Sequence, residues 1–299
     1  MSLQGITTVR DWLSRGEVHL RRGGVDESLA NAELLLAHVL EVKRPEVQAR
    51  LAQTLTEKQR HHYWHLVLER GKRKPLAYVL GDQPFLGLAI EVTPAVLIPR
   101  PETEELAEAV LETAKKELEA DPKRILHILE VGTGSGCISV ALAHFLPGAI
   151  VYATDISQAA LHLAEKNACR HRVERRIRFL REDLFRPEAL SGGPWADFLV
   201  SNPPYIPTAQ LPKLDAEVRM EPFLALDGGK DGLDAIRAIL ASAPKLLKPR
   251  GWLALEIGES QAGSVRGLLE RPACLFEGVQ VRKDLQGKDR VVLARRALR

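Results

Sequence analysis

Residues 125–257 repeat one pattern, a short apolar run followed by an amphipathic helical segment. The apolar runs, each predicted to be a strand, lie near 125–131, 150–154, 177–181, 198–201 and 252–257. The helices are expected near 137–145, 157–169, 233–247 and 260–270. Successive parallel strands need such crossover helices, so the pattern predicts a doubly wound, mostly parallel sheet with helices on both faces.

The two ends of the chain depart from this alternation. Residues 1–75 show helical periodicity without alternating strand segments, which predicts a small helical bundle domain. Residues 76–100 place β-forming residues between turn signals, so we expect a β-hairpin connector there. Residues 101–299 are then a Rossmann-like α/β domain. It closes with an antiparallel hairpin formed by 279–283 and 290–294.

The charge of the chain is unevenly distributed. The whole sequence carries a net +3, but residues 1–75 hold 13 Lys/Arg against 9 Asp/Glu, a net +4. The rest of the chain holds 29 against 30, a net −1. An anionic partner is therefore expected to meet the N-terminal part. Aromatic residues make up only 5%, which argues against a broad base-stacking surface for nucleic acid.

Neither a metal site nor a membrane span is expected. The chain has three cysteines without a C-x-x-C pair, namely Cys137, Cys169 and Cys274. His61, His62 and His65 are interleaved with apolar residues as on a helix face, and no carboxylate or cysteine completes a ligand set. The N-terminus lacks the apolar region of a signal peptide, and no apolar run approaches the ~18 residues of a membrane span. We expect a cytoplasmic protein.

The first strand of the α/β region runs into a glycine-rich turn. The turn consists of Gly132, Thr133, Gly134, Ser135 and Gly136. A dinucleotide fingerprint requires G-x-G-x-x-G/A, and its sixth position is here Cys137. The turn instead reads G-x-G-x-G, with an acid, Glu130, just before it. This variant suits S-adenosylmethionine, whose methionine end has no pyrophosphate.

Acidic residues follow the next two strands. Asp155 ends the second strand, where a carboxylate can accept both ribose hydroxyls of an adenosine. Asp183 follows the third strand and is expected to hold the adenine amino group, while Leu184 packs on the ring. One such acid alone is usually a solvated loop residue. Acids in register at the ends of consecutive strands favour a binding site.

The fourth strand ends in Asn202-Pro203-Pro204-Tyr205. A planar, conjugated NH2 group is difficult to methylate because its lone pair is delocalised. The Asn202 side-chain carbonyl and the Pro203 backbone carbonyl can each accept one N–H, which aligns the nitrogen with a sulfonium methyl group and stabilises the positive charge that develops. Tyr205 can cover the flat substrate group. The alternative is a tight Asn-Pro turn that closes a strand, and the upstream loop and acids disfavour it.

Together these segments resemble the protein-(glutamine-N5) methyltransferases that modify class-1 peptide chain release factors, the HemK family of class I S-adenosylmethionine-dependent methyltransferases. The resemblance covers nearly the whole chain. The matching segments are Leu97–Glu104, Gly132–Cys137, Asp155–Ser157, Asn202–Pro207, Glu221-Pro222, Ala225–Gly229, Glu256–Gly258, Lys283–Leu285 and Gly287–Arg290. Leu184 departs from some relatives, which carry Trp there.

The resemblance implies roles for these residues. Gly132–Gly136, Asp155, Asp183, Leu184 and Asn202 would bind S-adenosylmethionine. Asn202–Tyr205 would hold the glutamine amide, with Asn202, Pro203 and Tyr205 as the catalytic residues and no strong general base. The substrate would be the glutamine of the Gly-Gly-Gln loop in the release factor. We expect a monomer that binds neither nucleic acid nor a membrane directly, with residues 1–75 recognising the protein substrate.

Two other readings remain open from the residues alone. A nucleic-acid amino-methyltransferase would present adenine N6 or guanine N2 to the same Asn202–Tyr205 segment. The net −1 of the catalytic region disfavours it, whereas an arginine run favours it: Arg170, Arg172, Arg175, Arg176, Arg178 and Arg181. The second alternative is a non-enzymatic binding module. Such a protein is expected to carry substitutions in the glycine turn or in Asn202–Tyr205, and both motifs are intact. The sequence leaves the roles of Arg100 and Glu102 undecided.

Overall fold

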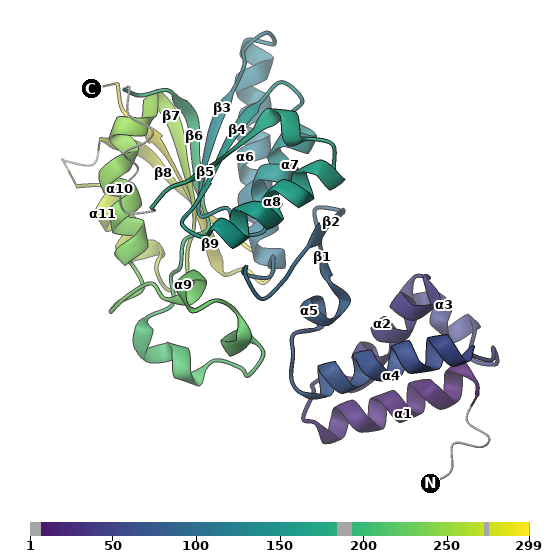
Figure 1. The fold of residues 1–299 in the computed structure, drawn as a ribbon. Coiled ribbons are helices and arrows are strands. Elements are labelled where there is room, and N and C mark those ends of the chain that lie inside the picture. The colour runs from purple at the N-terminus through teal and green to yellow at the C-terminus, as the bar shows by residue number, and fades with distance from the viewer. Residues whose placement is uncertain (1–6, 184–192, 272–274, 299) are drawn as a thin grey trace. The chain divides into compact units, whose positions relative to one another are not determined.

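The computed structural model packs as two compact units. It describes residues 7–183, 193–271 and 275–298. One unit contains the described residues up to Asp82 together with Asp215–Met220, and the other contains Gln83–Leu214 and the described residues from Glu221 onward. Figure 1 shows the ribbon of both. Within the described ranges no helix is long and apolar enough to cross a membrane.

The N-terminal unit is helical, as predicted. Its helices are α1 (Val9–Arg22), α2 (Ser28–Leu40), α3 (Arg44–Ala49), α4 (Glu57–Gly71) and α5 (Leu76–Leu80). The Thr8 and Thr56 hydroxyls cap the first turns of α1 and α4 by accepting backbone N–H groups. Leu35 and Tyr63, both fully buried, belong to the apolar core between the helices. Burial of this shared face holds the bundle together.

The Asp215–Met220 segment joins this unit through an ion-pair cluster. Glu217 accepts hydrogen bonds from Arg70 Nη1 at 3.0 Å and from Arg73 Nε and Nη2 at 2.6 Å each. Burial alone would raise the pKa of Glu217, but the two guanidinium groups lower it to about 2. Glu217 is therefore a carboxylate at neutral pH.

The connector differs from the expectation at its start. Residues 76–80, expected in a hairpin connector, form α5, which begins after Pro75 and ends at Gly81 in the left-handed conformation. The hairpin itself comprises β1 (Asp82–Phe85) and β2 (Leu88–Glu91). Leu86 and Gly87, both with positive φ, form its two-residue turn.

The second unit is built on a seven-stranded sheet of order β5-β4-β3-β6-β7-β9-β8. Its strands are β3 (His127–Val131), β4 (Ile150–Asp155), β5 (Ile177–Arg181), β6 (Ala196–Ser201), β7 (Leu247–Glu256), β8 (Phe276–Lys283) and β9 (Asp289–Arg296). The first five strands pair in parallel, and β9 pairs antiparallel with both β7 and β8. The prediction of a mostly parallel sheet with a C-terminal antiparallel hairpin is confirmed. β7 begins earlier than expected, because Leu247 already pairs with Ala196 across an irregularity.

Helices cover both faces of the sheet. They are α6 (Pro101–Ala120), α7 (Cys137–Phe145), α8 (Gln158–Arg170), α10 (Asp234–Leu246) and α11 (Ala262–Leu269). The short helix α9 (Phe223–Leu226) and 3-10 helices at Glu174–Arg176 and Thr208–Lys213 lie in the connecting segments, and a further 3-10 helix, Val218–Met220, belongs to the N-terminal unit. Figure 1 shows α10 and α11 on one side of the sheet and α6, α7 and α8 on the other. Because both faces are covered, consecutive residues such as Ile128 and Leu129 are fully buried.

Several arginines of the 170–181 run contact the backbone of their own unit. Arg176 Nη1 donates to the carbonyls of Ala143 and Leu146 at the C-terminal end of α7. Arg181 Nε donates to the Ile156 carbonyl at 3.3 Å. β5 is also an edge strand, and charged side chains on an edge discourage pairing with another chain. The run thus has structural roles at this edge of the sheet.

Candidate active site

The strand register brings the predicted site residues to one edge of the sheet. Val131, the last residue of β3, pairs with Thr154 of β4 and with Ser201 of β6. The next residue along each strand, namely Gly132, Asp155 and Asn202, therefore lies at the same edge of the sheet as the other two. The chain winds in opposite directions on the two sides of β3, and such a switch point is where open α/β sheets bind ligands.

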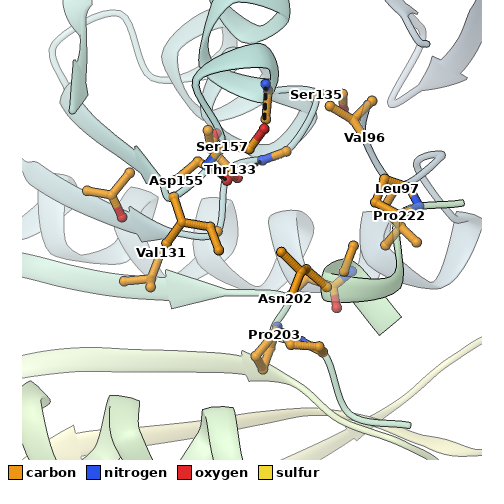
Figure 2. A pocket seen from close by; sticks show the side chains of 18 of the residues that line it. Val96, Leu97, Val131, Thr133, Ser135, Asp155, Ser157, Asn202, Pro203 and Pro222 are labelled. Carbon is orange, nitrogen blue, oxygen red and sulfur yellow. Dashed lines mark hydrogen bonds between the residues drawn. The ribbon is translucent and has the colours of Figure 1, made fainter. Parts of the chain in front are cut away.

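A pocket of about 420 Å³ opens at this edge. Its lining includes the predicted residues Gly132, Thr133, Gly134, Ser135, Asp155, Asp183, Asn202, Pro203 and Pro204. Gly136 and Tyr205 are not among the lining residues. Leu184 lies outside the described residues. Figure 2 shows Asp155 and Ser157 on one side of the pocket and Asn202 and Pro203 on the other.

The glycines of the turn serve two purposes. Gly134 has a φ of +54°, and a Cβ there would meet nothing within 4 Å, so the turn leaves open space beside its backbone. Gly136 has a φ of +79°, and its Cβ would lie 2.8 Å from that of Ala164. The third glycine therefore lets α7 pack against α8, whereas the second is free to approach a ligand.

Asp155 holds the glycine turn and faces the pocket. Its Oδ2 accepts a hydrogen bond from the Gly134 N–H at 2.9 Å, and its Oδ1 accepts one from the Ser157 N–H at 2.9 Å. Burial raises the pKa of Asp155, and these backbone N–H groups oppose the rise. Each carboxylate oxygen has a second lone pair, so the group can still accept hydrogen bonds from two ligand hydroxyls.

Glu130 is a buried carboxyl at the floor of the pocket. Only 1% of its surface is exposed, and it lies at the end of β3 beside the glycine turn. Its Oε2 accepts hydrogen bonds from the hydroxyls of Thr133, at 2.7 Å, and Ser139. Burial raises the pKa of Glu130 to about 7 against the effect of these two donors. A cation bound in the pocket would favour the ionised form.

Asn202 and Tyr205 make polar contacts that the sequence did not indicate. Asn202 Nδ2 donates to Thr103 Oγ1 at 3.0 Å, from the end of β6 to the first turn of α6. Tyr205 donates its hydroxyl to Glu256 Oε1 at 3.1 Å, and burial raises the pKa of Tyr205. A role for Tyr205 in covering the substrate stays a prediction.

A second wall of the pocket was missed at the residue level. It consists of Ala95, Val96, Leu97, Pro99 and Thr103 from one segment and Pro222, Phe223, Leu224, Ala225 and Asp227 from another. Glu221, 5% exposed, joins the two segments: its Oε2 accepts from the Ile98 N–H at 2.9 Å and its Oε1 accepts from Arg100 Nη2. Arg100 thus anchors this wall. Parts of both segments, namely Leu97–Glu104, Glu221-Pro222 and Ala225–Gly229, belong to the family resemblance, which was the available signal.

Most of this second wall is apolar. Its apolar side chains offer little to a charged ligand, whereas the opposite part of the lining includes the polar side chains of Thr133, Asp155 and Asn202. No group of three or more His, Cys, Asp or Glu residues in the described ranges is arranged to hold a metal ion. The pocket therefore has a polar part beside the glycine turn and a mostly apolar part beyond Asn202.

Two family models and several known proteins match this chain. Residues 11–81 match the family described as the PrmC N-terminal domain, and residues 108–220 match the family described as the methyltransferase small domain. The release factor glutamine methyltransferase of Moorella thermoacetica is 45% identical, with 97% of this chain and 99% of the relative covered. The human MTRF1L release factor glutamine methyltransferase is 38% identical, with 99% of this chain and 89% of the relative covered.

A solved structure shares the fold at low sequence identity. The hMettl16 catalytic domain, in complex with a MAT2A 3′UTR hairpin, has a TM-score of 0.54 at 16% identity and covers 82% of this chain and 83% of its own. This likeness concerns the fold alone.

The raised pKa of Glu130 predicts a pH-dependent stability. The folded protein holds this proton up to about pH 7, whereas an unfolded carboxyl releases it near its ordinary value. The contribution of Glu130 to stability therefore decreases as pH rises between those values. The carbonyl of glutamine can accept hydrogen bonds from the same two hydroxyls but does not titrate. We therefore expect the stability of Glu130→Gln to lack this decrease with rising pH.

The measurement is urea unfolding of both proteins from pH 5 to pH 8. The free energy of unfolding of Glu130→Gln, taken relative to the unsubstituted protein, should increase with pH. A difference that stays constant over this range would contradict the assigned burial effect.

Proposed function

The chain belongs to the release factor glutamine methyltransferases, and from this membership we propose that it transfers the methyl group of S-adenosylmethionine to the side-chain nitrogen, N5, of the glutamine in the Gly-Gly-Gln loop of class-1 release factors. One observation carries the proposal: a single pocket joins the glycine turn and Asp155 to Asn202, Pro203 and Pro204. Because release factors belong to the translation machinery, we propose the cytoplasm as the place of action.

The polar part of the pocket fits S-adenosylmethionine. Asp155 presents a carboxylate to the ribose hydroxyls, and the open space beside Gly132 and Gly134 admits the methionine end close to the backbone. Asp183, which also lines the pocket, would face the adenine. The buried carboxyl of Glu130 suits a ligand that carries positive charge. When bound, the cofactor supplies an electrophilic methyl group on a cationic sulfur.

Asn202 would orient the substrate nitrogen. Because Nδ2 is bonded to Thr103, the amide oxygen Oδ1 is the atom that remains for a substrate N–H. The Pro203 carbonyl would accept the second N–H. These two acceptors hold the nitrogen lone pair toward the methyl group and stabilise the positive charge that develops as the N–C bond forms. One amide proton then leaves to water.

The apolar wall suits the rest of the substrate. A glutamine side chain has a short hydrocarbon stem, and glycines on its N-terminal side leave it unobstructed. Leu97, Pro222 and Phe223 line the part of the pocket where this stem would lie. Phe223 and Leu224 are 58% and 68% exposed, so they are available at the rim to contact a protein loop.

The direct test is mass spectrometry of a release factor incubated with the enzyme and S-adenosylmethionine. We expect one added methyl group on the glutamine of the Gly-Gly-Gln loop. Parallel reactions contain DNA or ribosomal RNA in place of the release factor. Methylation of a nucleic acid, with none on the protein, would favour the nucleic-acid amino-methyltransferase instead.

Two substitutions should separate cofactor binding from methyl transfer. Asn202→Ala removes the amide acceptor, so we expect kcat to fall at least ~10²-fold while the Kd for S-adenosylmethionine stays unchanged. Asp155→Ala removes the ribose acceptor and should raise that Kd at least ~10-fold. Calorimetry gives the Kd values and methylation of the release factor gives kcat. Normal turnover by Asn202→Ala would contradict its assigned role.

We also propose that the N-terminal helical unit docks the release factor. Residues 1–75 have a net charge of +4, and Arg22, Lys43 and Lys58 are exposed in this unit. Complementary charge on a protein partner accelerates association and guides orientation. The unit would then raise the local concentration of the Gly-Gly-Gln loop at the pocket.

Reversal of these charges tests the docking proposal. The triple variant Arg22→Glu, Lys43→Glu, Lys58→Glu should raise KM for the intact release factor roughly 10-fold and leave kcat unchanged. The matched control reverses three exposed basic residues of the other unit, Lys116, Lys245 and Arg266. Equal effects of the two triple variants on KM, or no effect of the first, would argue against docking by this unit.

A further inference from the structure

We propose that Asn167 is a positioning residue shared by the two parts of the pocket: its amide joins Ser135, in the glycine turn, to Glu91, at the start of the segment that forms the second wall. The inference rests on the proposed function, since it assigns a residue to that same site. Asn167 is not among the lining residues and would touch neither the cofactor nor the release factor. It acts through the backbone groups that it binds.

The Asn167 side chain makes three hydrogen bonds. It belongs to α8 and is fully buried. Its Oδ1 accepts a hydrogen bond from the Glu91 N–H at 2.7 Å, and its Nδ2 donates to the Glu91 carbonyl at 2.9 Å. The same Nδ2 donates to the Ser135 carbonyl at 2.9 Å. Since Nδ2 carries two hydrogens, it can serve both carbonyls at once. One side chain thus joins α8 to two segments that are distant in the sequence.

The pairing with Glu91 explains why an amide stands at this position. Among the described residues, β1 and β2 form a sheet of two strands, so β2 has one edge without a neighbouring strand. Glu91 ends β2, and the Asn167 amide offers its backbone N–H and carbonyl the acceptor and the donor that a neighbouring strand would offer. Asparagine is a poor helix former, so its place inside α8 reflects these tertiary bonds rather than local preference.

The bond to Ser135 acts on the cofactor side of the pocket. Ser135 lines the pocket (Figure 2), and Gly134 and Gly136 on either side of it have positive φ. The Gly136 N–H donates to the Thr133 carbonyl at 2.8 Å, and the Ser135 carbonyl accepts from Asn167. Both ends of the peptide group between Ser135 and Gly136 are therefore fixed. This holds the turn in the shape that leaves open space beside Gly134.

The bond to Glu91 acts on the second wall. Ala95, the first residue of this wall, follows Glu91 by four residues. At the other end of the same segment, the Ile98 N–H is held by Glu221 at 2.9 Å. The segment between Glu91 and Ile98 is thus fixed at both ends, and Asn167 fixes the first. Because the same amide holds Ser135, the polar and the apolar parts of the pocket share one anchor.

Neighbouring contacts of α8 serve one of these segments at a time. His171 Nε2 lies 2.8 Å from the Ala89 carbonyl, and Lys166 Nζ lies 3.9 Å from the Glu91 carboxylate, so both hold the hairpin on α8. Ala164 packs against Gly136 of the turn. Asn167 bonds to the hairpin and to the turn together, which distinguishes its effect from theirs.

Alanine at position 167 tests the shared anchor. Asn167→Ala removes all three bonds, so the Kd for S-adenosylmethionine should rise at least ~5-fold and KM for the release factor at least ~3-fold, with kcat within about twofold. Calorimetry gives the Kd, and methylation of the release factor at saturating cofactor gives KM and kcat. A merely structural defect would instead reduce the fraction of active protein, which lowers apparent kcat and the binding stoichiometry but leaves Kd and KM unchanged.

A second variant keeps the size of the side chain. Asn167→Asp fills the same space, so it preserves the packing of α8 that Asn167→Ala loses. An ionised carboxyl accepts the Glu91 N–H but has no hydrogen for the carbonyls of Glu91 and Ser135, and a protonated one has a single hydrogen for the two. The Kd for S-adenosylmethionine should therefore rise at least ~3-fold in this variant also.

Two controls separate the anchor from general destabilisation. Asn31 is a buried asparagine of the N-terminal unit with the same number of bonds: Nδ2 donates to the carbonyls of Asp26 and Glu27, and Oδ1 accepts from Arg70 Nε. Asn31→Ala should leave the cofactor Kd within about twofold. His171→Ala removes a bond between α8 and the hairpin without reaching the turn, and it should also leave this Kd within about twofold.

The inference is overturned if the cofactor Kd, or KM for the release factor, is unchanged in the folded Asn167 variants. It is equally overturned if either control raises the cofactor Kd as much as Asn167→Ala does. Failure of the proposed function looks different, because the unsubstituted protein would then leave the release factor unmethylated. The assays with unsubstituted protein are therefore run first and serve as the reference for every variant.

Discussion

The candidate active site depends on the parallel pairing of β3 with β4 on one side and with β6 on the other. Parallel strands in register end at the same edge, so Gly132, Asp155 and Asn202 emerge there together although up to 70 residues of sequence separate them. The two crossovers leave β3 in opposite directions, which opens the space that the ligand would occupy. A shift of one residue in either pairing would turn these side chains to the other face of the sheet.

Buried carboxyl groups set the electrostatic character of this edge. Glu130 and Glu256 are almost fully buried, and Asp155 is half-buried between the glycine turn and α8. The hydrogen-bond donors to these three carboxyl groups are hydroxyl groups for Glu130 and Glu256 and backbone N–H groups for Asp155. Such an arrangement has a free energy cost without a ligand, because burial opposes ionisation. It favours a ligand with positive charge and disfavours a phosphate backbone near the pocket.

Much of the fold was predictable because its signals are local. Apolar runs and the glycine turn indicated β3, β4, β5 and β6. The departures occur where distant pairing overrides local preference. Leu247 was expected in a helix but extends β7, because it pairs with Ala196. Residues 76–80 form a helix because Ala77 and Tyr78 are buried in that conformation.

For the candidate site, the sequence by itself determined which polar and glycine residues stand at the strand ends: the glycine turn, Asp155 and the Asn202–Pro204 segment. It did so because strand, turn and side chain are adjacent in the chain. Only the tertiary structure decided what surrounds them. The surrounding residues come from distant parts of the chain: Thr103 from the first turn of α6, Glu221 from a loop and Glu256 from the end of β7. Their hydrogen-bond partners lie between 51 and 123 residues away in the sequence. Hydrogen bonds over such separations arise from packing of the sheet and its helices, and no local pattern encodes them.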